Sequence, residues 1–290
     1  MTRNPIARAL RVLAGIGAVS FGVLSYAYLT LPDVRPLATT NPTTTAFMEL
    51  REREAAQAGR PVRRVQRWVP YSRISINLRK AVLAAEDGSF FEHEGIDVAE
   101  IKKSIQDSIE KGESLRGAST ITQQLAKNLY LSPSRDPLRK VRELMITWRL
   151  ETALSKARIF EIYLNVIEWG DLIWGAEAAA RTYFGVPASA LSREQAALLA
   201  GAIINPRVYS PANPRGRLAR RQQIILARMP GYEPPVAVTL PVVEPEPSDD
   251  IPQEAPTEEP SSPTVIDTDE GNGPTHEPIP APPPPSEPNP

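Results

Sequence analysis

The 290-residue chain contains no cysteine, which excludes disulfide bonds and thiolate metal sites. Histidine is almost as scarce, because His93 is the only one before residue 232. No second histidine follows it at the spacing of four that a zincin helix requires, so a zinc protease of that kind is excluded. The chain also lacks a P-loop and a GxGxxG motif, which leaves no sequence support for a nucleotide-binding domain.

Lysine and arginine are absent from residues 232–290, which hold 13 acidic residues and 18 of the 31 prolines. Such a segment buries too little apolar surface to order itself, so a disordered, acidic, proline- and glutamate-rich tail is predicted there. The rest of the chain carries 33 basic and 21 acidic residues, a net charge of +12. This excess indicates an anionic partner, such as nucleic acid, acidic lipid headgroups or a phosphorylated substrate.

Charged residues are also missing from residues 12–31, a run of 20 residues that matches a hydrocarbon core of about 30 Å. Three arginines precede this run, so residues 1–11 are expected in the cytoplasm and the chain after the run outside it. A cleaved signal peptide is the alternative, but the length of the run and the lack of a small-x-small site before Pro32 favour a retained transmembrane helix. This topology disfavours nucleic acid as the partner.

Residues 32–74 form a juxtamembrane segment whose many arginines are expected to be solvated or to contact anionic lipid. An all-α domain is predicted over residues 75–231, because the pattern there is helical and shows no sustained two-residue alternation. The helices of this domain are predicted from their end signals, which are capping serines, an Asp-Pro pair and a basic stretch. They are expected at residues 76–86, 137–154, 156 to about 166, after Ser192, and 215–229.

The first stretch with chemical potential is AVLAAEDGSFFEHEG at residues 81–95. A spacing of four puts Glu86 on the same helix face as Leu78 and Val82, whereas Asp87 is rotated by about 100°. Burial on that apolar face would raise the pKa of Glu86 toward neutrality, which suits a general base. The other interpretation is a surface acidic pair that ends the helix.

The second stretch is GASTITQQLAKN at residues 117–128, where a glycine precedes a predicted helix. Spacings of four create two polar stripes opposite an apolar face, and they consist of Ser119, Gln123 and Lys127, and of Thr120, Gln124 and Asn128. Hydroxyls, amides and a lysine near a helix N-terminus suit a phosphate or sugar ligand. An ordinary amphipathic helix with a hydroxyl cap is the alternative.

The third stretch, RDPLRKVRE, places Glu143 beside Arg139 and Lys140 on one helix face. Such a group can bind pyrophosphate while Glu143 positions the bases or holds a divalent cation; a surface ladder of ion pairs is the alternative. Further along, in SKARIFEIYLN, Glu161 is expected to be an internal support.

Taken together, these stretches resemble the family 51 glycosyltransferases, the peptidoglycan polymerases found alone or as the first domain of bifunctional penicillin-binding proteins. The motif EDxxFxxHxG is matched by Glu86, Asp87, Phe90, His93 and Gly95. GGSTITQQ is matched by Gly117 and by Ser119 through Gln124, with Ala118 replacing the second glycine. RKxxE is matched by Arg139, Lys140 and Glu143. KxxILExYLN is matched by Lys156, Ile159, Glu161, Tyr163, Leu164 and Asn165, with Phe160 in place of leucine.

Two further segments, LPDVRPL and NPTTTAFM, look like those of the monofunctional biosynthetic transglycosylases, which have one membrane anchor. The acidic tail agrees with this subgroup, because it is too short and too rich in proline for a transpeptidase domain. One departure is AIINP at residues 202–206, where the family more often has a leucine-proline pair. A local loop difference without consequence for the chemistry is expected there.

The resemblance implies a lysozyme-like bilobal helical domain behind one transmembrane helix in the cell inner membrane. It also implies that the enzyme polymerises lipid II into β-1,4 glycan strands, inverts the anomeric carbon and releases undecaprenyl pyrophosphate. Glu86 would be the general base and Glu143 the second catalytic residue; no cofactor is required by the motifs, although a divalent cation (Mg or Mn) could bind at Glu143.

The resemblance extends to the other site residues. Substrate contacts are expected from Asp87, Phe90, His93, Gly117, Ser119, Thr120, Gln123, Gln124, Lys127, Asn128, Arg135, Arg139 and Lys140. Structural support is expected from Glu161, Tyr163 and Asn165. The implied partners are lipid II, the growing glycan strand and the membrane, with other cell-wall synthesis or division proteins as further candidates.

Two other functions compete with this one. A peptidoglycan-cleaving hydrolase or lytic transglycosylase could share a helical fold and a catalytic glutamate, but cleavage needs no phosphate clamp, so the cationic helix around Arg139 favours synthesis. A non-catalytic membrane-anchored scaffold for wall enzymes predicts gaps in the motifs, and the catalytic positions show none.

Overall fold

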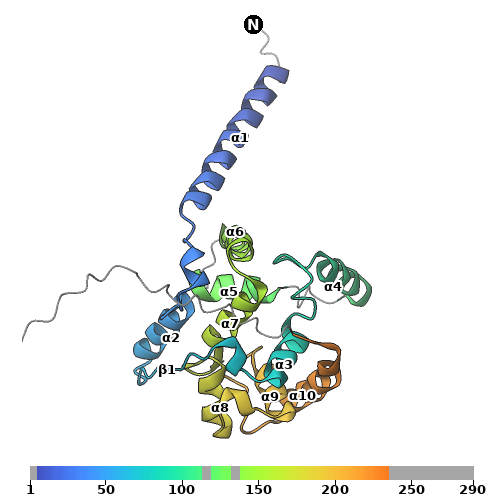
Figure 1. Cartoon of the computed structure of the whole chain (residues 1–290). Helices are drawn as coiled ribbons and strands as arrows, with labels where there is room; N and C mark the ends of the chain where they lie inside the picture. Colours follow the sequence, from blue (N-terminus) through green and yellow to red (C-terminus); the bar gives the residue numbers. More distant parts are fainter. Residues whose placement is uncertain (1–4, 113–118, 132–137, 235–290) are drawn as a thin grey trace, which may run out of the picture. The chain divides into compact units, whose positions relative to one another are not determined.

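A computed structural model of the chain describes residues 5–112, 119–131 and 138–234, and helices dominate them, as expected. In chain order the helices are α1 (Pro5–Leu29), α2 (Ala46–Gln57), α3 (Ile76–Glu86), α4 (Val98–Lys111), α5 (Ile121–Tyr130), α6 (Leu138–Ala153), α7 (Lys156–Val166), α8 (Ala176–Phe184), α9 (Arg193–Ala202) and α10 (Arg217–Arg228). Figure 1 shows α5 and α7 at the centre, with α2 on one side and α3, α9 and α10 on the other.

Local capping explains why several predicted helix starts are confirmed. The hydroxyls of Ser75 and Ser155 accept hydrogen bonds from backbone N–H groups in the first turns of α3 and α7. Ser192 and Gln195 form the expected capping box at the start of α9. The Asp-Pro pair predicted to open α6 lies outside the described residues.

The domain also contains a small sheet that the sequence pattern did not reveal. Its strands are β1 (Val65–Gln66), β2 (Glu168–Gly170) and β3 (Ile173–Trp174), with β3 in the middle, parallel to β1 and antiparallel to β2. Strands of two or three residues are too short to show an alternation. Asn165 secures the segment after β1, because its side chain both accepts from the N–H and donates to the carbonyl of Val69, each at 2.9 Å.

The juxtamembrane segment packs on the folded domain, and the expectation of solvated arginines holds for only some of them. Met48 and Ala55 of α2 have no exposed surface, and α2 contacts α5. Several of its arginines have carboxylate partners: Arg51 pairs with Glu168 at 3.0 Å and Arg64 with Glu52 at 2.6 Å. Apolar burial and the Arg51–Glu168 pair therefore join this segment to the domain, whereas the Arg64–Glu52 pair lies within the segment.

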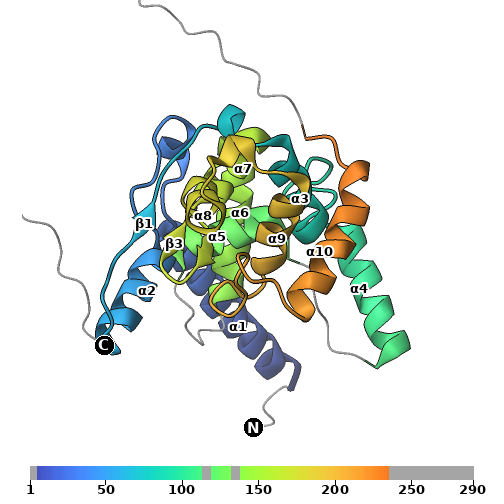
Figure 2. The same ribbon diagram turned by 90° about the horizontal axis from the view of Figure 1, so that it is seen from below.

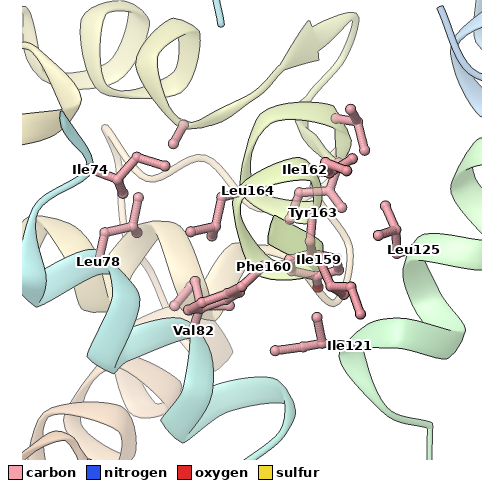
Figure 3. Packing of buried hydrophobic residues seen from close by; sticks show 14 of the residues in the cluster. Ile74, Leu78, Val82, Ile121, Leu125, Ile159, Phe160, Ile162, Tyr163 and Leu164 are labelled. Atoms are coloured by element: carbon pink, nitrogen blue, oxygen red, sulfur yellow. The ribbon is translucent and has the colours of Figure 1, made fainter. Parts of the chain in front are cut away.

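Helices α3, α5 and α7 share one apolar core. Figure 3 shows side chains from these three helices gathered in a single cluster, and its fully buried members include Leu78, Val82, Ile121, Leu125, Ile159 and Phe160. This packing brings the C-terminal end of α3 beside α5, so that two motif stretches far apart in the sequence meet. Figure 2 shows α9 and α10 beside α3, in agreement with the contacts among these helices.

Helix α1 is long and apolar enough to cross a membrane, with a candidate span at Arg8–Tyr26. Helix α1 begins before the predicted span of residues 12–31, because arginine is compatible with helical backbone. It ends two residues before the end of that span, because a helix tends to stop ahead of a proline, here Pro32. Arg149 of α6 donates hydrogen bonds of 3.3–3.4 Å to the carbonyls of Tyr28, Leu31 and Pro32. A cation thus caps the C-terminal end of α1.

The folded part extends slightly beyond residue 231. Tyr232 packs against Gly88, where an added Cβ would lie 2.6 Å from the tyrosine hydroxyl, and Glu233 pairs with Lys80. The predicted tail therefore contributes its first residues to the domain, whereas residues 235–290 lie outside the described part of the chain.

Candidate functional site

Glu86 is the last residue of α3 and lies mostly inside the protein, with 14% of its side chain exposed. Burial raises the pKa of its carboxyl group, a shift that Gln124 and Arg221 oppose. Gln124 donates a 3.0 Å hydrogen bond to Oε2, and Arg221 of α10 lies 3.9 Å from Oε1. The alternative of an exposed acidic pair is therefore wrong.

Gln124 is itself held from the other side by Tyr163. The Tyr163 hydroxyl donates a 2.9 Å hydrogen bond to the amide oxygen of Gln124. Because an ionised carboxylate can only accept, the Gln124 NH₂ group faces Glu86 and its oxygen faces Tyr163. Tyr163 has no exposed surface, and burial raises its pKa well above the ordinary value. Structural support was the role expected of Tyr163, and in the structure its hydroxyl contacts the residue that binds Glu86.

Asp87 and His93 join the end of α3 to the start of α5. The carboxylate of Asp87 accepts a 2.9 Å hydrogen bond from the backbone N–H of Ile121. His93 accepts from the N–H of Gly95 through Nδ1, so its proton lies on Nε2, which is 3.1 Å from Asp87. These two residues were expected to contact substrate, but the structure gives their polar atoms partners within the protein.

Phe90 and Gln123 were also expected to contact substrate, and both side chains are buried in the structure. Phe90 has no exposed surface and packs against Phe160, with the ammonium of Lys156 4.5 Å from its ring centroid. Gln123 is 4% exposed, and its side-chain oxygen accepts the backbone N–H of Thr120 in a capping box. Neither side chain can contact substrate from these positions. Gln123, which was assigned to a polar stripe because of its spacing, forms part of a helix cap.

The third motif places a buried carboxylate and two partly exposed cations beside α5. Glu143 is 5% exposed and pairs with Lys140 at 2.5 Å and Arg139 at 3.5 Å, so a merely superficial ladder is excluded. Lys127 of α5 is half-buried, and burial lowers its pKa; Arg139 and Lys140 add to this, while Glu143 and Glu86 oppose it. Lys127 therefore interacts electrostatically with both Glu86 and Glu143.

The carboxylates that could bind a divalent cation already have partners within the protein. A cation bound at Glu143 would compete with Lys140 and Arg139. A second group, Asp87, His93 and Asp97, has ligand atoms within 4.8 Å of one another. However, Asp87 and His93 already bind each other and backbone N–H groups, and Asp97 accepts the N–H of Glu100. Hydrogen bonding within the protein accounts for these atoms.

Two cavities adjoin the Glu86–Gln124 pair. The first, of about 560 Å³, is lined among others by Glu86, Ser119 and Thr120. The second, of about 230 Å³, is lined among others by Gln124, Lys127 and Asn128. The side chain of Asn128 also donates to the carbonyl of Gln124 at 2.8 Å, which steadies this wall. One residue of the pair thus lines each of two cavities.

The supports expected from the fourth motif also have clear contacts. Glu161 accepts the backbone N–H of Tyr71 at 2.8 Å and pairs with Arg158. Asn165 holds Val69 as described above. Gly117 and Arg135, both expected at the site, lie outside the described residues.

Sequence reasoning missed several residues that line or face the site. Arg221 approaches Glu86, Tyr232 lines the first cavity, and Glu168 and Arg207 line the second. The loop over residues 202–206, expected to be of no consequence, contributes Ile203, Ile204, Asn205 and Pro206 to the second cavity. Only this loop carried a sequence signal, namely its departure from the usual leucine-proline pair.

Comparisons with known proteins give the relatives of this chain. A family model described as Transglycosylase matches residues 52–230. A biosynthetic peptidoglycan transglycosylase of Dechloromonas aromatica (strain RCB) is 50% identical over 195 residues, which cover 67% of this chain and 84% of that protein. Its namesake from Thiobacillus denitrificans (strain ATCC 25259 / T1) is 52% identical over 194 residues, 66% of this chain and 82% of that protein. The chain therefore belongs to the transglycosylase family.

Proposed function

We propose that Glu86 is the general base with which this chain, a peptidoglycan glycosyltransferase, extends glycan strands from lipid II. The observation that carries the assignment is a mostly buried carboxylate with a raised pKa, held by Gln124 and within electrostatic reach of Lys127. A general base works best when its pKa lies near the working pH, and burial moves Glu86 in that direction.

In the proposed reaction the 4-hydroxyl of the GlcNAc in lipid II is the nucleophile. Glu86 accepts the hydroxyl proton while the oxygen attacks the anomeric carbon of the MurNAc at the end of the growing strand. The bond to undecaprenyl pyrophosphate breaks, and the new β-1,4 link has the inverted configuration. Gln124 keeps one carboxylate oxygen fixed during this transfer.

The pyrophosphate leaving group carries most of the developing charge, so cations must meet it in the transition state. We assign this role to Lys127, Arg139 and Lys140, with Ser119 as a neutral donor and Glu143 as the residue that positions Arg139 and Lys140. Loss of one such contact typically costs on the order of 3 kcal/mol of transition-state stabilisation. An incoming pyrophosphate would also compensate the desolvation and like-charge repulsion at Lys127.

The two cavities support a transfer between two large substrates. A strand-forming enzyme must hold a donor and an acceptor at once, one on each side of the base. The first cavity contains Glu86 and the second contains its partner Gln124. A hydrolase needs only water as its second reactant, and it has no use for the cations around Glu143.

We further propose that α1 anchors the enzyme in the cell inner membrane, with the N-terminus in the cytoplasm and the domain outside. The support is the apolar span of α1 and the arginines that precede it. The substrate and the released pyrophosphate are lipid-linked, so an anchored enzyme would meet them in two dimensions at high local concentration.

One assay tests the assignment. Purified full-length protein in detergent is incubated with lipid II, and the products are separated by chain length. The wild type should form glycan strands, and Glu86→Gln should form almost none although it keeps its fold by circular dichroism. A wild type that makes no strands, or a Glu86→Gln variant that makes as many, would refute the proposal; cleavage of finished glycan by the wild type would favour the hydrolase.

A further inference from the structure

Glu168, the first residue of β2, carries a buried carboxylate that is only half used. It is 5% exposed, and its Oε2 accepts a 3.0 Å hydrogen bond from Nε of Arg51. Its Oε1 is buried as well, yet it accepts no hydrogen bond from the described part of the chain. Buried acceptors are normally satisfied, and one that is not calls for an explanation.

The location of Glu168 explains why one of its oxygens has no donor within the described part of the chain. It lines the second cavity together with Gln124 and Lys127, which belong to the proposed reaction site. A ligand in this cavity would therefore lie beside both the residue that holds Glu86 and a cation for the leaving group. Glu168 and the residues of the proposed reaction site thus line the same cavity.

The wall around Glu168 is firmly built. Arg51 is also bound to Glu54 at 2.8 Å, and its guanidinium lies 4.8 Å from the ring centroid of Phe47. Arg207 donates to the same Glu54 at 3.2 Å. These contacts tie α2 to the segment after α9, so Oε2 of Glu168 stays with Arg51 and Oε1 is the oxygen left without a donor in the described part of the chain.

The lining defines the kind of group that Oε1 can accept from. Arg51, Lys127 and Arg207 are cations on this cavity, so an ammonium group would be repelled. The apolar part of the lining comes from Phe47, Ile167, Ile203 and Ile204. A neutral O–H or N–H next to a small apolar group fits both features, and an N-acetylated sugar offers this combination.

We infer that Glu168 is a substrate-binding residue that accepts a hydrogen bond from a hydroxyl or acetamido N–H of an N-acetylated sugar unit in the second cavity. This inference rests on the proposed function and adds to it a residue outside the four motifs. Glu168 contributes binding and orientation of the sugar, and the proton transfer remains with Glu86.

Glu168→Gln is the informative substitution, because it reverses the polarity of one atom. Arg51 can only donate, so the amide oxygen must stay with Arg51 and the NH₂ group takes the place of Oε1. A donor then faces an acetamido N–H, which cannot accept. A sugar hydroxyl could turn and accept, but it would lose the stronger, charge-assisted hydrogen bond to the carboxylate. Glu54→Gln is the matched control, since Glu54 binds the same arginine but does not line the cavity.

The experiment measures lipid II polymerisation by the full-length protein over a range of substrate concentrations, and Tm for each variant. Glu168→Gln should raise the apparent KM about tenfold or more, with a much smaller change in kcat and a Tm close to that of the wild type. Glu54→Gln should match the wild type in KM.

Equal KM values for wild type and Glu168→Gln would overturn the inference while leaving the polymerase function intact. A parallel loss of activity and Tm in both variants would overturn it too, because it would show that Glu168 only supports Arg51. An inactive wild type would instead refute the proposed function itself.

Discussion

The side-chain amide of Gln124 lies 3.0 Å from the carboxylate of Glu86, and a third residue holds this amide from the other side. The carboxylate can only accept, so the NH₂ group faces it, and the hydroxyl of Tyr163 donates to the amide oxygen that is left on the other side. A buried tyrosine of α7 thus stabilises the contact between a glutamine of α5 and the proposed base at the end of α3. The core shared by these three helices is therefore also the support of the site (Figure 3).

Tyr163→Phe should weaken this arrangement without emptying the core. Loss of one hydrogen bond should lower kcat about fivefold to tenfold. The Gln124 hydrogen bond lowers the pKa of Glu86, so weakening it should raise that pKa and move the acidic limb of the kcat–pH profile to higher pH. Tyr183→Phe is the control, because its hydroxyl donates to the Trp169 carbonyl instead. An unchanged profile for Tyr163→Phe would contradict the positioning role.

Arg221→Gln tests the cation that faces the other oxygen of Glu86. Arg221 lies 3.9 Å from Oε1 and lowers the pKa of the carboxyl group against the effect of burial. Its removal should therefore raise the pKa of Glu86 further and shift the acidic limb upward again. Arg220→Gln, an exposed neighbour on α10, should leave the profile in place. A shift toward lower pH in Arg221→Gln would be incompatible with the geometry.

Lys127→Met removes the cation that connects the two ends of the site. If Lys127 meets the pyrophosphate, kcat/KM should fall at least about a hundredfold. Tm should not fall, because burial already disfavours the charged form of this lysine. Lys103→Met is the matched control, since its side chain is 70% exposed although it lines the first cavity. Comparable activity in the two variants would remove Lys127 from the clamp.

Local features of the fold were predictable from the sequence, because each depends on neighbouring residues. Ser75 and Ser155 cap helices through N–H groups three positions away, and the spacing of Leu78 and Val82 from Glu86 revealed a buried face. The pairing of Glu143 with cations three and four positions before it was predictable for the same reason.

The remaining features depend on contacts between distant segments. Gln124 is 38 residues from Glu86, and Arg51 is 117 residues from Glu168, so no periodicity could pair them. The motif residue Phe90 was misassigned as a substrate contact because a motif does not show which side chains it buries. Only the packing of α3 against α5 and α7 separates the buried motif residues from those that line a cavity.

Phe90→Ala tests this distinction between packing and binding. The ring has no exposed surface and packs against Phe91 and Phe160, so its loss should leave a cavity and lower the free energy of unfolding by about 3–5 kcal/mol. For a domain of this size the expected drop in Tm is about 10 °C, which a thermal melt would detect. Ile109→Ala should change Tm little, because Ile109 is 78% exposed. Below its Tm, Phe90→Ala should keep the KM of the wild type; an unchanged Tm with a strongly raised KM would show instead that the ring contacts substrate.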